Sequence, residues 1–359
     1  MDFILNGGSK IQSEIDAAIK NGKREIFIEG NYEIEKAVVI PSHFTVILGN
    51  CHLRLQDDSF TNIFTNTATV GEDRTSKARD CDIHIIGRGH AVLDGGKFNG
   101  LTERNCRERG MSMTVNNLIL LSNLEDFSIT GVHLCNQRHW AVNLVHCAFG
   151  VVRDIDVLAD DEILYVDGER DYEIDYRGLC RNHLPMLRNA DGIDLRHGCH
   201  DILVENITGF TEDDTVALTA LPGGKLSVTD LPTDLYNITV RNVRSSSWCA
   251  NIRLLNQGGV KLYNILIDGV TDTSKDSTHM NRGLFGIRIG DKRLYSTRHS
   301  TPDETYNIVV RNVFSRAETI VDMAGSITNC TVENIYGFDG YTKKIENAAE
   351  LFGKCKIEE

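Results

Sequence analysis

Short segments repeat along the chain, each alternating apolar and polar residues and most ending near an N-V, N-I or G-V pair. They are NLEDFSITGV (123–132), CAFGVVRDIDV (147–157), GCHDILVENI (198–207), DLYNITVRNV (234–243), VKLYNILIDGV (260–270), ETYNIVVRNV (304–313) and SITNCTVENI (326–335). Alternation at period two marks β-strands. Irregularly spaced strand repeats are typical of a solenoid with loop insertions between constant coils. The sequence therefore predicts an all-β, parallel β-helix that forms a single domain over residues 1–359.

The two ends of the chain are expected to close this solenoid. Residues 9–21 combine the capping-box pattern Ser9-Lys-Ile-Gln12 with apolar residues at helical spacing, and Gly22 follows as a stop. This segment predicts a short amphipathic capping helix, because an open end would expose the core and unpaired strand edges. KKIENAAELF (343–352) predicts a second capping helix at the C-terminus.

Two segments interrupt the repeat. Residues 158–188 are rich in Asp, Glu and Tyr, and residues 272–303 are rich in Arg, Lys, His, Ser and Thr. Both are predicted to be long loops, and long loops on a rigid scaffold tend to build a functional site.

Charge, hydropathy and cysteine usage exclude several classes of function. A net charge of −13 argues against nucleic acid or an anionic membrane surface as partner. No apolar run is long enough to span a membrane, and residues 1–30 lack the pattern of a signal peptide. We therefore expect a cytoplasmic protein, or an extracellular one if a leader precedes residue 1. The ten cysteines include no CxxC pair and are expected to be buried as small hydrophobic residues.

A second strand precedes each repeat segment, and these strands align with one another. They are WAVNLV (140–145), DGIDLR (191–196), DTVALT (214–219), ANIRLL (250–255), FGIRIG (285–290) and TIVDMA (319–324). Two apolar side chains in each strand point inward, so the residue between them must face outward. The outward column is Asn143, Asp194, Ala217, Arg253, Arg288 and Asp322. The alignment predicts acids and arginines in one row along the solenoid.

A cluster of carboxylates is predicted where two of these strands begin. Asp191 and Asp214 occupy the same register on successive coils, and Asp213 adjoins Asp214. Carboxylates this close repel one another and should raise at least one pKa. A neutral acid beside an ionised base is what cleavage of a glycosidic bond requires. The alternative interpretation is a solvated acidic turn, since Asp is common in turns.

From about residue 10 to about residue 340 the chain resembles the polygalacturonase family of glycoside hydrolases, in the pectin-lyase-like group. The resemblance is strongest in NADGIDL (189–195) and EDDTVAL (212–218), which are similar to the family's Asn-x-Asp-Gly-Ile-Asp and Asp-Asp motifs. It implies a right-handed β-helix and an inverting glycosidase that requires no cofactor.

The resemblance also assigns roles to the matching residues. Asp213 would be the general acid that protonates the leaving oxygen, and Asp191 and Asp214 would hold and deprotonate the attacking water. Arg288 matches the arginine of the family's Arg-Ile-Lys motif and would bind substrate.

The chain departs from the family pattern at two positions. Ala250 stands in place of the motif histidine, and Gly290 replaces the lysine that helps to bind a uronate carboxylate in the family. These departures favour a neutral or differently decorated sugar as substrate. Arg253 and Lys292 could supply part of the missing positive charge, with Asp194 as a further substrate-binding residue.

Several alternatives stay open at this stage. Trp140 either stacks on a sugar ring or covers the core at a turn. No His or Cys spacing suggests zinc, so no metal site is expected. A calcium-dependent polysaccharide lyase on the same fold is a second possible function, with an arginine as base. A non-catalytic β-helix that binds carbohydrate is a third. The insertion 158–188 could close the groove and favour exo cleavage of short oligosaccharides.

Overall fold

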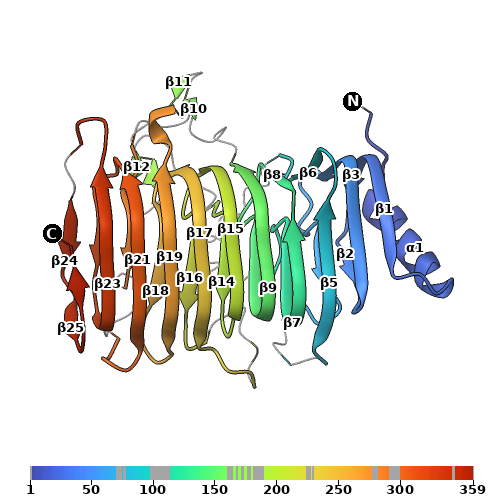
Figure 1. Cartoon of the computed structure of the whole chain (residues 1–359). Helices are drawn as coiled ribbons and strands as arrows, with labels where there is room; N and C mark the ends of the chain where they lie inside the picture. The colour runs from blue at the N-terminus through green and yellow to red at the C-terminus, as the bar shows by residue number, and fades with distance from the viewer. Residues whose placement is uncertain are drawn as a thin grey trace.

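The protein is described by a computed structural model, in which parallel strands stack into one elongated body (Figure 1). The described residues are 2–69, 75, 78–97, 114–159, 165–166, 169–170, 174–175, 179–180, 190–223, 228, 230–276, 282–290, 300–341 and 344–358. No helix among these residues is both long and apolar enough to cross a membrane.

Long strands form the first ladder of the solenoid, and each pairs in parallel with the long strand of the next coil. They are β1 (Glu25–Ile34), β3 (Phe44–Leu55), β5 (Asp80–Gly87), β7 (Ile119–Thr130), β9 (Val142–Leu158), β15 (His200–Thr211), β17 (Leu235–Ser247), β19 (Leu262–Asp272), β21 (Thr305–Ser315) and β23 (Ser326–Gly337). Two short strands, β6 (Ala91–Asp94) and β8 (His133–Cys135), pair in parallel beside them. The repeat segments all lie on this ladder.

Shorter strands form the second ladder, which carries the predicted site. They are β2 (Val38–Ile40), β4 (Phe64–Asn66), β14 (Ile193–Arg196), β16 (Val216–Ala220), β18 (Ala250–Asn256), β20 (Phe285–Ile289), β22 (Thr319–Met323) and β24 (Ile345–Asn347). The first residues of β7 and β9 complete this ladder between β4 and β14. The predicted parallel, all-β solenoid is confirmed, whereas its right-handedness stays a prediction.

Asparagines in the left-handed backbone region bend several of the long strands. Asn237 and Asn242 of β17 both have φ 53°, and equivalent positions recur on the neighbouring coils. Asparagine tolerates this conformation better than most residues do. The amide of Asn237 donates to Asp201 Oδ1 at 3.0 Å, and the amide of Asn264 donates to Asn237 Oδ1 at 3.0 Å. These stacked amides fix the corners of the coils and the register between them.

The interior of the coils is a continuous apolar core. The inward residues of the second ladder, such as Ile193, Leu195, Val216 and Leu218, are fully buried. Eight cysteines have described side chains, and all eight are free thiols. Cys51, Cys147, Cys199 and Cys330 are buried as predicted, whereas Cys81, Cys135, Cys249 and Cys355 are only partly covered.

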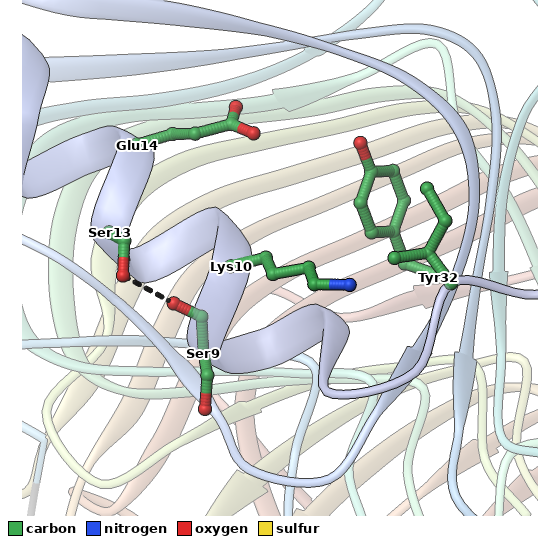
Figure 2. A pocket seen from close by; sticks show the side chains of 6 residues that line it. Ser9, Lys10, Ser13, Glu14 and Tyr32 are labelled. Carbon is green, nitrogen blue, oxygen red and sulfur yellow. Dashed lines mark hydrogen bonds between the residues drawn. The ribbon is translucent and has the colours of Figure 1, made fainter.

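The predicted N-terminal capping helix is confirmed as α1 (Gly7–Lys20), but the capping box is wrong. The helix begins after Asn6, and Ser9 lies inside its first turn. The carboxylate of Glu35 instead accepts hydrogen bonds from the backbone N–H groups of Gly8 and Ser9 at 3.0 and 2.9 Å. A hollow beside α1, lined by residues that include Lys10, Glu14 and Tyr32, contains none of the predicted site residues (Figure 2).

Two further expectations about elements need correction. Residues 343–352 do not form a helix, because the segment contains β24 and β25 (Glu350–Phe352), and β26 (Lys356–Ile357) follows. These strands pair with the open edges of β22 and β23, which offer backbone partners that an isolated segment lacks.

The interruption 272–303 is not one loop, since it contains a 3-10 turn, Ser274–Asp276, and β20. The interruption 158–188 lies largely outside the described residues. Its described part includes two small antiparallel pairs, β10 (Tyr165–Val166) with β11 (Glu169–Arg170) and β12 (Ile174–Asp175) with β13 (Leu179–Cys180).

Candidate active site

The structure confirms the register of the predicted outward column, although not its exposure. Asp194 is the Cα partner of both Asn143 and Ala217, and Arg288 is the partner of both Arg253 and Asp322. The exposed fractions are 0% for Asp194, 3% for Arg253 and 7% for Arg288. The column is therefore a row of buried charges, which makes each pairing in it more consequential than on an open surface.

The catalytic pair predicted from sequence lies in the turn between β15 and β16. The hydroxyls of Thr211 and Ser247 both donate to the backbone carbonyl of Asp213, at 2.7 and 2.6 Å. Ser247 belongs to the next coil, and its hydroxyl also accepts the backbone N–H of Cys249 at 3.0 Å. Small hydroxyl residues thus fix the backbone of this turn against its neighbour. Because the backbone of the turn is fixed, the side chain of Asp213 can point in few directions.

Asp191 reaches the same place from the preceding coil. The backbone N–H of Gly192 donates to the carbonyl of Asp214 at 3.0 Å, which sets the two coils in register. A Cβ atom at Gly192 would lie 2.4 Å from the carbonyl oxygen of Thr215. The close approach of the two turns therefore requires the glycine that follows Asp191 in the NADGIDL motif.

Burial and mutual repulsion raise the pKa values of this carboxylate cluster. Burial, followed by the charges of Asp194 and Asp213, raises the pKa of Asp191 well above its usual value. Burial, reinforced by Asp213, raises the pKa of Asp214 to about 8, although Arg253 and Arg288 oppose the shift. Burial also raises the pKa of Asp213. The cluster therefore holds protons at neutral pH, as an acid–base site requires.

Asp194 is engaged by a residue that the sequence analysis did not single out. Arg196 donates from Nη2 and Nε to Asp194 Oδ1, at 2.7 and 3.1 Å. Burial raises the pKa of Asp194 to about 6 despite this cation. Its other oxygen, Oδ2, and Asp191 Oδ1 are buried and accept no hydrogen bond from the described residues. The charge of Asp194 helps to raise the pKa of Asp191, and contact of Asp194 with substrate stays a prediction.

The structure does not support Trp140 as a platform for a sugar ring. The indole is 1% exposed, and the guanidinium of Arg196 lies over it with Cζ 3.7 Å from the ring centroid. A sugar would need the face that Arg196 covers. Of the two interpretations of Trp140 from sequence, coverage of the core at a turn is the one that fits.

The predicted substrate-binding arginines lie beside the cluster with partners inside the protein. Arg253 donates from Nη1 to the carbonyl of Gly290 at 2.7 Å. Arg288 forms an ion pair with Asp322, with Nε 3.3 Å from Oδ2, and its guanidinium lies over the ring of Phe285. Both cations oppose the rise in the pKa values of Asp213 and Asp214. Lys292, the other predicted cation, lies outside the described residues.

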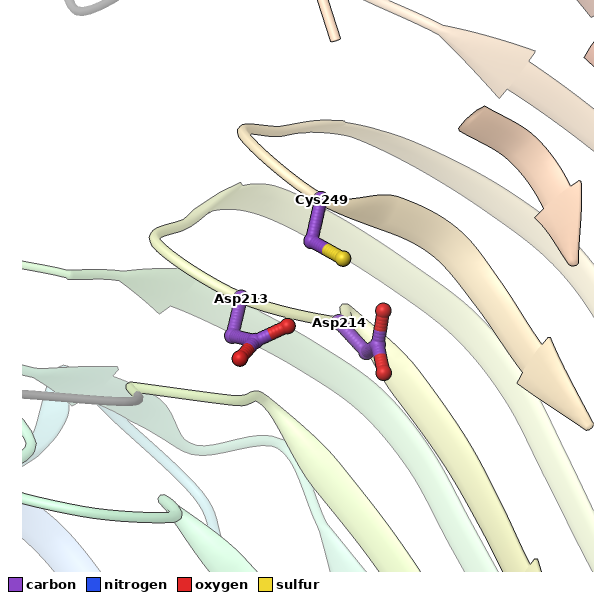
Figure 3. A group of neighbouring side chains, drawn as sticks. All are labelled: Asp213, Asp214 and Cys249. Carbon is purple, nitrogen blue, oxygen red and sulfur yellow. The ribbon is translucent and has the colours of Figure 1, made fainter. Parts of the chain in front are cut away.

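Cys249 is the functional candidate that sequence reasoning missed. It stands one coil beyond Asp213, and the side chains of Asp213, Asp214 and Cys249 converge (Figure 3). Burial, followed by Asp214 and Asp213, raises the pKa of the thiol well above its usual value. The protonated thiol lies beside the Asp213 carboxyl and opposes the rise in pKa that burial causes there. Alignment of the turns on successive coils was the signal that could have found it.

The same three side chains are the candidate metal ligands among the described residues. One donor atom from each of Asp213, Asp214 and Cys249 lies within 4.8 Å of the others. Calcium takes six to eight oxygen ligands, and a thiol does not suit it. Zinc would need the thiolate, which the neighbouring carboxylates disfavour. The donor set therefore fits neither ion well.

The buried acids should make stability depend on pH. Since the folded state holds protons that the unfolded chain releases, the stabilisation from Asp214 is complete below about pH 4 and is lost as pH rises towards about 8. We expect the melting temperature of Asp214→Asn to fall less than that of the wild type across this window. Asp126→Asn, at an exposed carboxylate, is the control. Parallel curves for Asp214→Asn and the wild type would contradict the raised pKa.

Comparison with protein families matches residues 33–232 to the model described as glycosyl hydrolases family 28. The matched range includes Asp191, Asp213 and Asp214, whereas Cys249 and Gly290 lie beyond it. A search of curated proteins gives no match.

Solved structures share the fold at low sequence identity. A polygalacturonase from Erwinia carotovora ssp. carotovora is 14% identical with a TM-score of 0.53, over 99% of this chain and 95% of that one. A hyperthermoactive exopolygalacturonase from Thermotoga maritima is 14% identical with a TM-score of 0.54, over 98% and 86%. The tailspike protein of Escherichia coli bacteriophage HK620, in complex with a pentasaccharide, is 12% identical with a TM-score of 0.57, over 95% and 61%.

Proposed function

The chain belongs to glycosyl hydrolases family 28 and is a glycosidase, and we propose that it cleaves its substrate by an inverting, single-displacement mechanism in which Asp213 is the general acid. The observation that carries this proposal is the convergence of Asp191, Asp213 and Asp214 from adjacent coils, with raised pKa values in a buried setting. A solvated acidic turn would have neither the burial nor the shared protons.

The proposed reaction needs two carboxyl groups in opposite protonation states. The neutral carboxyl of Asp213 gives its proton to the glycosidic oxygen as the bond from that oxygen to the anomeric carbon breaks. A water molecule attacks the anomeric carbon from the opposite face, and its proton passes to the ionised member of the pair Asp191 and Asp214. By the family motif Asp213 is the acid, and we assign Asp191 and Asp214 together to hold and deprotonate this water.

Product analysis tests the mechanism directly. The purified chain is incubated with galacturonides, galactosides, rhamnosides, fucosides and fructans, with calcium and separately with EDTA. Fragments that together gain one water, without need of calcium, would support hydrolysis, and proton NMR at early times should show the inverted anomer first. Unsaturated fragments that form only with calcium would instead indicate a lyase. A product that retains the anomeric configuration would contradict the single displacement.

We propose that the sugar at the cleaved bond is not held by a charge at position 290. The nearby arginines, Arg253 and Arg288, already have partners inside the protein. A neutral sugar, or one whose charge lies elsewhere, therefore suits this position. Exo cleavage of short oligosaccharides remains part of the proposal, and mixed long products from a polymer would contradict it.

Cys249 gives the mechanism a signature in its pH profile. Because the thiol lowers the pKa of Asp213, Cys249→Ala should raise that pKa. The acid must be protonated to act, so the alkaline limb of the kcat/KM profile should move to higher pH, by up to about one unit for one lost hydrogen bond. Cys249→Ser, which keeps a donor, should stay close to the wild type. Identical profiles for Cys249→Ala and the wild type would exclude an effect of the Cys249 thiol on the pKa of Asp213.

A further inference from the structure

We propose that Arg282 and Arg316, held on the ring of Tyr341, bind an anionic substituent of the substrate at a distance from the cleaved bond. The substituent is a carboxylate or a sulfate ester on a sugar further along the bound chain. This inference rests on the proposed function, because the ligand is the carbohydrate whose cleavage is assigned to Asp213.

The three residues lie on the same row of turns as the catalytic acids. The turn before β16 carries Asp213, and the turns before β20, β22 and β24 carry Arg282, Arg316 and Tyr341 in that order. The backbone N–H of Leu284 donates to Trp248, at 3.3 Å, so these turns stack coil upon coil. With about 4.8 Å between coils, the arginines lie roughly 10 and 14 Å along the axis from Asp213. A sugar chain laid along the row would reach both places.

Two guanidinium groups converge on one aromatic ring at this place. The Cζ atoms of Arg282 and Arg316 lie 4.8 and 4.7 Å from the centroid of Tyr341. Arg316 also donates from Nη2 to the Tyr341 hydroxyl at 3.2 Å, and Arg282 donates from Nε to the Arg316 carbonyl at 3.1 Å. These contacts fix the position of both cations without neutralising either one.

Among the described residues, no carboxylate forms an ion pair with Arg282 or Arg316. Arg316 Nε is buried and has no acceptor. The neighbouring acids are engaged by other groups, since Asp339 pairs with Lys275 at 3.5 Å and Asp272 Oδ2 accepts from the Ser315 hydroxyl and from the backbone N–H of Arg316, each at 3.1 Å.

Other arginines of this solenoid pair with acids. Arg241 pairs with Glu205 at 2.6 Å, and Arg311 pairs with Asp268 at 2.7 Å. Within the described part of the chain neither cation has an ionic partner, which leaves its charge uncompensated, and a buried donor without an acceptor is costly. Both costs would be removed by an anion bound between the two guanidinium groups.

The chemistry of the pair selects the class of ligand. A guanidinium offers paired N–H donors that match the oxygens of a carboxylate or a sulfate. The family motif places positive charge at the position of Gly290, whereas in the described part of this chain cations without an acid partner lie further along the row. Recognition of an acidic group would therefore be displaced from the cleaved bond, in agreement with a neutral sugar beside Asp213.

Binding measurements on an inactive background test the assignment. In Asp213→Asn protein, calorimetric titrations use three oligosaccharides of equal length: an oligogalacturonide, a sulfated galactan fragment and a neutral galactan fragment. One anionic probe should bind tightly, and the added pair Arg282→Gln and Arg316→Gln should weaken it by at least tenfold. The neutral probe should change less than twofold. Arg24→Gln, an exposed arginine at the other end of the solenoid, is the matched control.

The outcomes separate this inference from the proposed function. The double variant could lose affinity because it folds poorly. Arg282→Glu alone changes one exposed side chain, and it should weaken the anionic probe without disturbing the fold. The carboxylate and sulfate arms identify the group. Unchanged affinity in the variants, or no preference of the unsubstituted background for either anionic probe, would overturn the assignment. Hydrolysis of the same probes by the active chain is scored separately, so cleavage of the neutral probe without any preference for an anionic one would overturn the anionic site and leave the glycosidase mechanism intact.

Discussion

Asp213→Asn is expected to lower kcat by about 10²- to 10⁴-fold, because the leaving oxygen then departs without a proton. Substrate affinity should change little, since the amide keeps the shape of the carboxyl. Asp126→Asn makes the same chemical change at an exposed residue with φ 58° and should leave the rate unaltered.

The choice of leaving group separates the acid from the base. A nitrophenyl glycoside of the cleaved sugar has a leaving group that departs without protonation, so Asp213→Asn should lose much less activity on it than on the natural linkage. Asp214→Asn should lose activity on both substrates to a similar extent, because water must still be deprotonated. Equal losses for Asp213→Asn on the two substrates would remove Asp213 from the role of acid.

Gly290→Lys, which restores the family's motif, is expected to destabilise the protein by about 3 kcal/mol or more and to add no activity on galacturonides. Gly290 has φ 81°, and a Cβ atom there would lie 1.9 Å from the carbonyl oxygen of Ala324. The same residue presents its carbonyl to Arg253. Denaturant titration would measure the loss, and Gly290→Ala should show most of it, because the clash begins at Cβ.

Two other glycines separate the causes of this loss. Gly22 has φ 71° and open space around it, so Gly22→Ala reports the cost of the backbone conformation alone. A Cβ atom at Gly223 would meet nothing within 4 Å, and Gly223→Ala should change stability by less than about 0.5 kcal/mol. A Gly290→Lys protein as stable as the wild type would mean that the turn can accept a lysine. The absence of the motif lysine from this chain would then have no structural cause.

The stacking of Asp191 on Asp214 could be predicted from the sequence because it follows from local periodicity. Alternation in DGIDLR and DTVALT leaves one register that buries Ile193 beside Val216, and that register stacks Asp191 on Asp214. The C-terminal segment was mispredicted because its composition favours a helix in isolation. The unpaired edges of β22 and β23 decide its structure instead.

The sequence by itself determined the parallel solenoid, the order of its coils and the residues that share a row, since each depends on a repeat of period two. Only the tertiary structure decided that the row of charges is buried, that Arg196 covers Trp140 and that Gly290 leaves no space for a side chain. The tertiary structure alone also decided that Arg282 and Arg316 converge on Tyr341. Each of these features depends on how turns of variable length place side chains on neighbouring coils, and strand periodicity carries no information about that placement.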